Sequence, residues 1–142
     1  MNATWIAFLR IAVGIFFLGQ GINKIEWLTS SEFLKTNLDR YALNAHPAAQ
    51  WYQERVAKPG VEIWARAIPM GEMLIGIALI LGVLTRTTLS IATLLVVNFH
   101  ITNGKFFSLT FFSDPYALLL LACLLALSFS KAHGTWALTQ KW

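Results

Sequence analysis

A single carboxylate inside a long apolar segment constrains this chain more than any other feature. From Ala67 to Leu84, Glu72 is the only ionisable residue. At about 1.5 Å of rise per residue, a helix over this segment is about 27 Å long, close to the hydrocarbon thickness of a bilayer. A carboxylate at that depth costs at least about 2.5 kcal/mol, so it requires pairing, protonation or water. Arg10, in the first apolar segment, is the expected partner of Glu72.

The composition also favours lipid as the surrounding solvent. Of the 142 residues, 56% are hydrophobic and 13% are charged, and the mean hydropathy is +0.58. Ordinary soluble domains carry about 25% charged residues. We therefore expect a single membrane domain over residues 1–142, in contact with the lipid bilayer. The formal charge of +4 does not indicate nucleic acid as a partner, because the eleven Lys and Arg residues form no basic stripe.

Hydropathy and turn signals predict an all-α fold, an integral membrane four-helix bundle. The spans are expected at residues 5–22, 64–84, 88–101 and 115–130. The polar segment 23–63 is expected to form an interfacial cap with two short amphipathic helices, over residues 32–43 and 47–58. Thr85-Arg86-Thr87 is the expected tight return, and Asp114 before Pro115 predicts the start of the last helix.

Four spans would place both termini and Arg86 on one face of the membrane and the cap on the other. We expect the cell inner (plasma) membrane, with the termini in the cytoplasm.

Polar residues in or next to the predicted spans are candidates for a site. Arg10 and Lys24 share one helix face with Gly14 and Gly21, and glycines at this spacing allow a neighbouring helix to approach closely. Arg10, Lys24 and Glu72 could hold a quinone headgroup, a small anion or a proton relay. Alternatively, they form a buried pair that only fixes the register of the helices.

His100, near the cap end of the third span, could hydrogen-bond a quinone carbonyl or act as an axial ligand to a haem or chlorophyll metal. The alternative is a structural hydrogen bond to the cap. No second histidine stands four residues away, so a metal site is not predicted. Cys123 is the only cysteine, which permits neither an internal disulfide nor a dithiol redox motif.

The order of these polar residues resembles that of the DoxX/DoxD-like family of small four-helix membrane proteins. The matching positions are Arg10-x3-Gly14-x2-Phe17-x3-Gly21-x2-Lys24 and Glu72-x3-Gly76-x4-Leu81-Gly82-Val83-Leu84-Thr85-Arg86. The resemblance implies a four-helix fold and a link to quinone or sulfur-compound redox chemistry, since members are associated with terminal quinol oxidase and thiosulfate:quinone oxidoreductase. It carries over Arg10, Lys24, Glu72 and Arg86 as the shared polar positions.

Three functional hypotheses remain open from the sequence, and whether the chain is catalytic is not decided among them. In the first, a DoxX-like protein holds a quinone or small redox substrate near Arg10, Glu72 and His100 and acts with partner subunits. In the second, the chain is a non-catalytic accessory subunit of a larger respiratory or photosynthetic membrane complex, with lipid, carotenoid or chlorophyll at its apolar faces. In the third, it is a small transporter gated by a proton on Glu72.

Overall fold

The computed structural model describes residues 3–43, 45–130, 136 and 138, and this part of the chain is helical with no strand. The expected all-α class is therefore confirmed. The elements are α1 (Ala3–Ile22), η1 (Ile25–Leu28), α2 (Glu32–Ala42), α3 (Pro47–Tyr52), η2 (Gln53–Ala57), α4 (Val61–Leu81), α5 (Thr85–Thr102), η3 (Lys105–Phe107), α6 (Thr110–Ser113), η4 (Pro115–Leu119) and α7 (Leu120–Phe129).

Two of these helices, α1 and α4, are long and apolar enough to cross a membrane, judged by length and composition among the described residues. Tyr116–Phe129 is a shorter apolar helix. Helices lie at all four segments where spans were predicted, but the four-span membrane bundle itself stays a prediction.

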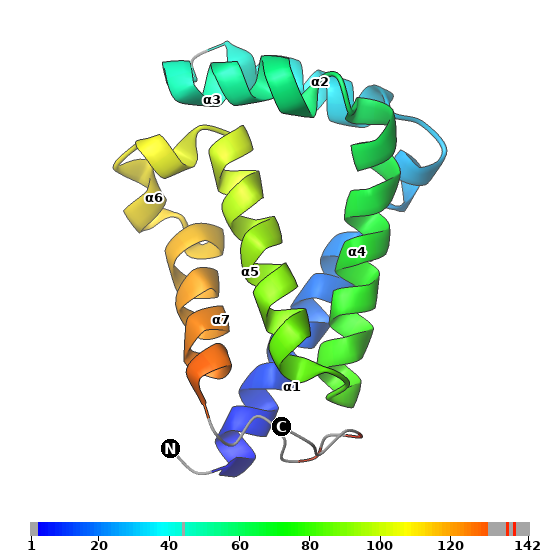
Figure 1. Ribbon diagram of the computed structural model, residues 1–142, viewed down its shortest axis with the longest axis vertical. Helices are drawn as coiled ribbons and strands as arrows, with labels where there is room; N and C mark the ends of the chain where they lie inside the picture. Colours follow the sequence, from blue (N-terminus) through cyan, green and yellow to red (C-terminus); the bar gives the residue numbers. More distant parts are fainter. Residues whose placement is uncertain (1–2, 44, 131–135, 137, 139–142) are drawn as a thin grey trace.

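The helices form two pairs that diverge toward the cap (Figure 1). α4 and α5 leave a common turn and separate along their length; α1 packs on α4, and α7 packs on α5. α2 and α3 lie across the open end, opposite the start of α1 and the end of α7. Most of the buried apolar side chains form one cluster between the helices, which includes Phe17, Leu79, Leu89 and Leu124.

Glycines bring the backbones of α1 and α4 into contact, as their spacing predicted. A Cβ placed on Gly76 would lie 2.6 Å from the Leu18 nitrogen and 2.7 Å from the Gly14 carbonyl oxygen. A Cβ on Gly14 would lie 2.9 Å from the Gly76 carbonyl oxygen. Only glycine permits this approach, so α1 and α4 form the most closely packed pair.

The turn between α4 and α5 lies earlier than the sequence indicated. α4 ends at Leu81 because Gly82 adopts a left-handed conformation, with φ of 69°, and closes the helix end. Leu84 follows with φ of 45°, and α5 already begins at Thr85. The expected return at residues 85–87 was therefore wrong, since these residues form the first turn of α5.

The cap consists of η1, α2, α3 and η2, at the positions expected for its two helices. Leu34 and Leu38 of α2 pack on Ala57, Val61 and Ala65, which ties the cap to the start of α4.

Polar contacts tie the other end of the cap to α5. The Gln53 amide nitrogen donates to the Thr102 carbonyl oxygen over 2.6 Å, and the Tyr52 hydroxyl donates to the Asn98 side-chain oxygen. The cap thus bridges the two diverging helix pairs.

Candidate functional site

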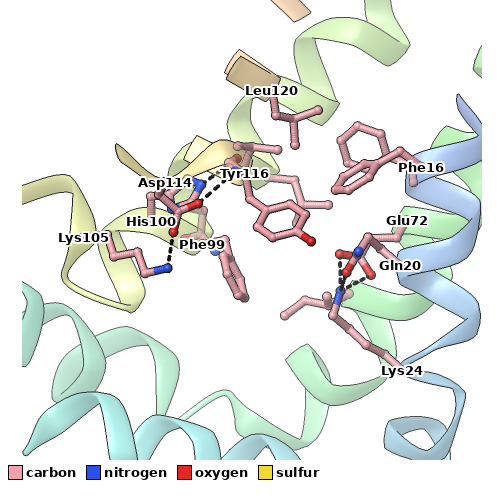
Figure 2. A pocket seen from close by; sticks show the side chains of 15 residues that line it. Phe16, Gln20, Lys24, Glu72, Phe99, His100, Lys105, Asp114, Tyr116 and Leu120 are labelled. Carbon is pink, nitrogen blue, oxygen red and sulfur yellow. Dashed lines mark hydrogen bonds and ion pairs between the residues drawn. The ribbon is translucent and has the colours of Figure 1, made fainter. Parts of the chain in front are cut away.

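A pocket of about 340 Å³ lies between the two helix pairs, next to the cap (Figure 2). Its walls are mainly apolar, with polar groups on two opposite sides. The lining residues are Phe16, Phe17, Gln20, Lys24, Ile68, Glu72, Leu95, Val96, Asn98, Phe99, His100, Lys105, Asp114, Tyr116 and Leu120.

The structure pairs Glu72 with Lys24 and not with Arg10. The Lys24 ammonium donates to both carboxylate oxygens of Glu72, each at 2.7 Å, and lies 3.4 Å from the side-chain oxygen of Gln20. It also lies 5.9 Å from the centre of the Trp27 ring. The Lys24 and Glu72 side chains are 15% and 10% exposed, so the pair is largely withdrawn from solvent but still reaches the pocket.

The close packing of α1 on α4 explains why these two residues meet. A Cβ on Gly21 would lie 2.8 Å from the Pro69 carbonyl oxygen, so the end of α1 rests directly on α4 there. Lys24 follows Gly21 by three residues, and Glu72 follows Pro69 by three. The pair is therefore placed by a backbone contact that needs glycine.

Arg10 and Arg86 lie away from the pocket. Arg10 is fully buried in α1 and donates to the Trp136 carbonyl oxygen over 3.0 Å. It is separated from Lys24 by fourteen residues, about 21 Å along a helix. Arg86 is exposed in the first turn of α5, at the end remote from the cap. Of the five candidate residues, Lys24, Glu72 and His100 line the same pocket, with Lys24 in contact with Glu72 and His100 on the opposite side.

His100 is a pocket residue with a fixed hydrogen bond. Only 2% of the residue is exposed, and its Nε2 lies 3.0 Å from the Tyr116 carbonyl oxygen. Because a carbonyl oxygen only accepts, Nε2 must carry the hydrogen. The ring stands edge-on to Phe99 and Phe111, with centres 5.9 and 6.0 Å away. This contact resembles the structural alternative foreseen for His100, although it joins α5 to η4 and not to the cap.

A second ion pair forms the opposite side of the pocket. Lys105 donates to Asp114, and Asp114 accepts from the backbone nitrogens of Tyr116 at 2.8 Å and Ala117 at 3.2 Å. Asp114 thus caps η4, as predicted. Burial by itself raises the pKa of Asp114, but the Lys105 contact and the two backbone donors outweigh it, so the pKa lies below its usual value.

Several pocket residues were missed by the sequence reasoning. Gln20 could have been found, because it precedes Lys24 by one helical turn on the same face. Lys105, Asp114 and Tyr116 could not, because their position depends on the path of the loop after α5. In Figure 2 the Tyr116 hydroxyl is directed toward the side that carries Glu72, and the Tyr116 ring stacks on Phe16 with centres 5.9 Å apart.

The charges of the pocket cancel. Two cations, Lys24 and Lys105, each contact a carboxylate, so the lining carries no formal net charge when His100 is neutral. Within the described residues, no group of three or more His, Cys, Asp or Glu side chains is placed to hold a metal ion. Such a site is suited to an uncharged ligand that combines an apolar ring with polar atoms at opposite ends.

Comparison with known proteins gives one family match. The DoxX family model matches residues 5–103, well over half of the chain, from α1 through α5. The match includes Gln20, Lys24, Glu72 and His100 but ends before the second ion pair. No significant match was found among curated proteins or solved structures.

Proposed function

Because the chain belongs to the DoxX family of membrane proteins, we propose that it binds the headgroup of a membrane quinone in this pocket. We further propose that it takes part in quinone-linked electron transfer together with partner subunits. The pocket itself supports this proposal most directly, since it combines aromatic and aliphatic walls with two polar ends next to the cap.

The size and lining of the pocket agree with a quinone headgroup. Its volume of about 340 Å³ falls in the range of small-molecule sites, roughly 300 to 1,000 Å³. Phe16, Phe17 and Phe99 supply flat apolar surface for a ring, while Glu72 and Tyr116 supply polar groups. Leu95 and Leu120 add aliphatic lining.

The charge balance favours a quinone over a sulfur compound at this site. Sulfur oxyanions and hydrosulfide are negatively charged, and burying an anion requires a compensating positive charge. Here Lys24 and Lys105 are already neutralised by Glu72 and Asp114. The single Cys123 offers no second thiol in this chain for sulfur exchange. We therefore assign electron donation to a partner or to a diffusing reductant.

We also propose that α1, α4, α5 and the η4–α7 segment all cross the inner membrane, with the termini in the cytoplasm. Exposed apolar side chains along three of these helices support lipid contact, including Phe8, Ile15, Leu74, Ile77 and Leu94. Cysteine labelling with a membrane-impermeant maleimide tests this in a Cys123→Ser background. In cells from which the outer membrane has been removed, Gln50→Cys should react with the maleimide. Thr87→Cys should react only after the inner membrane has also been permeabilised. Reaction of both positions from outside would refute the four-span arrangement.

Quinone binding is tested with the purified protein in lipid nanodiscs. Quinone should be found by mass spectrometry in protein isolated from native membranes, and a decyl-substituted benzoquinone should bind saturably. Leu120→Trp adds bulk to the pocket lining at a residue that belongs to neither ion pair and should raise the Kd at least tenfold. The matched control is Leu118→Trp, because Leu118 is 40% exposed and does not line the pocket. Absence of both copurified and added quinone would refute the proposal.

The accessory-subunit hypothesis receives no specific support from the structure. The exposed apolar surface is expected for any membrane protein in lipid. His100 is almost fully buried, and its Nε2 is already engaged by the Tyr116 carbonyl oxygen, so a chlorophyll at the lipid face would not reach it. Isolation under native conditions distinguishes the two: a bound pigment or a fixed complex without quinone would favour the accessory role.

A further inference from the structure

The hydrogen-bond capacity of Lys24 is fully used inside the protein. An ammonium has three hydrogens and no acceptor. The three nearest acceptors of Lys24 are the two Glu72 oxygens, at 2.7 Å each, and the Gln20 side-chain oxygen, at 3.4 Å. A ligand carbonyl oxygen that enters this end of the pocket therefore finds no free donor on Lys24.

Glu72, by contrast, retains acceptor capacity. A carboxylate has about four lone-pair sites, and Lys24 occupies one on each oxygen. In the described part of the chain, no hydrogen bond to Glu72 other than the two from Lys24 is recorded, and Glu72 lines the pocket. A ligand group that donates a hydrogen would find an acceptor here.

Lys24 also fixes the orientation of the Gln20 amide. Because Lys24 can only donate, the oxygen of the amide must face it, and the NH₂ group must point the other way. Gln20 lines the pocket beside Glu72 (Figure 2). Gln20 Nε2 has no hydrogen-bond partner among the described residues, so a ligand at this end can meet one acceptor, the Glu72 carboxylate, and one unused donor, the Gln20 NH₂.

We propose that Glu72 and Gln20 together bind a ligand hydroxyl, so that the pocket holds the reduced quinol more tightly than the oxidised quinone. This inference rests on the proposed quinone function. Addition of two electrons and two protons converts both quinone carbonyls into hydroxyls. A hydroxyl both donates and accepts, which matches the two groups, whereas a carbonyl only accepts and would face the carboxylate unfavourably.

The expected preference can be measured in two independent ways. A hydrogen bond to a charged group corresponds to about tenfold or more in affinity, so the quinol should bind at least about tenfold more tightly. Tighter binding of the reduced form raises the two-electron midpoint potential of the bound quinone by about 30 mV for each factor of ten. The Kd of each form is measured anaerobically in nanodiscs with a decyl-substituted benzoquinone and its quinol, and the potential by redox titration.

Two substitutions test the assigned residues. Glu72→Gln replaces the carboxylate with an isosteric amide that can donate, so the affinity ratio should fall to about one. Gln20→Leu removes the donor but keeps Lys24 and Glu72 together, so the quinol should bind several-fold more weakly. Glu54→Gln and Gln50→Leu make the same chemical changes on exposed cap residues outside the pocket, and both should keep the wild-type ratio.

The outcomes separate the inference from the proposed function. If neither form binds, the quinone function is wrong and the inference with it. If both forms bind equally, or the quinone binds more tightly, the function stands and the inference is overturned. A preference for quinol that survives in Glu72→Gln, or unchanged quinol binding in Gln20→Leu, would likewise overturn the assignment. Loss of the preference in Glu72→Gln and weaker quinol binding in Gln20→Leu, with neither change in the controls, supports it.

Discussion

Gly76→Ala should separate α1 from α4 and destabilise the protein. The new Cβ would lie 2.6 Å from the Leu18 backbone nitrogen, where ordinary contact begins at 3.4 Å. The atom that must retreat belongs to the backbone, so α1 has to move by roughly 0.8 Å. A gap of 0.5–1 Å forfeits about a quarter to a half of the attraction between packed atoms.

We expect a loss of about 2 kcal/mol in the free energy of unfolding. Overpacking of a close contact costs about 1–3 kcal/mol, and the higher helix propensity of alanine returns up to about 1 kcal/mol of it. Packing is the main force between helices in lipid, so the loss is not offset by a hydrophobic term. Unfolding in mixed detergent with increasing SDS, followed by far-UV circular dichroism, measures the difference.

Gly71→Ala in the same helix is the matched control. A Cβ at Gly71 would meet nothing within 4 Å, so this variant should be neutral or up to about 1 kcal/mol more stable. Equal stability of Gly76→Ala and Gly71→Ala would refute the claim that backbone contact holds α1 against α4.

Three further predictions concern the polar contacts. Lys24→Met leaves the largely buried Glu72 without its partner and should lower the free energy of unfolding by about 3 kcal/mol in the SDS assay. The double variant Lys24→Met with Glu72→Leu should recover most of this loss, and a double variant as unstable as Lys24→Met would contradict the prediction. Because the pKa of Asp114 is lower in the folded protein, its contribution to stability is complete above the unfolded pKa and is lost as the pH falls through the folded pKa; Asp114→Asn should flatten the decline of stability in acid, and an unchanged pH profile would disprove it. Gln53→Leu leaves the Thr102 carbonyl oxygen without its donor, so the free energy of opening of α3 should fall by about 1–3 kcal/mol and its amide hydrogens should exchange faster. Wild-type exchange rates would show that this hydrogen bond does not hold the cap.

The sequence alone was sufficient to predict the positions of the helices and one contact between helices. Apolar periodicity and turn residues placed helices at the four expected segments, and the glycine spacing on α1 predicted its close approach to a neighbour. Asp114 before Pro115 correctly marked a helix start. These features are local, so they could be read from neighbouring residues.

The choice of partner for Glu72 could not be read in this way. Periodicity shows which residues share a helix face, but it does not fix how far one helix is shifted along another. The sequence places Arg10 and Lys24 on one helix face, and only the contacts at Gly14 and Gly21 determine that Lys24, just beyond the end of α1, is level with Glu72. The position of Lys105 and Asp114, on the opposite side of the pocket, depends on the loop between α5 and η4, and the sequence of this loop has no periodic pattern.

The divergence of the two helix pairs has a mechanical consequence. The pairs are joined at one end by the short turn at Gly82 and at the other by the cap, through Tyr52 and Gln53. The length of the cap therefore sets the distance between the two helix pairs, and with it the width of the pocket. The backbones of α1 and α4 are already in contact, so these two helices cannot move closer to each other. Deleting one helical turn from the cap would bring the two helix pairs closer together and reduce the pocket volume, without a single substitution among the residues that line the pocket.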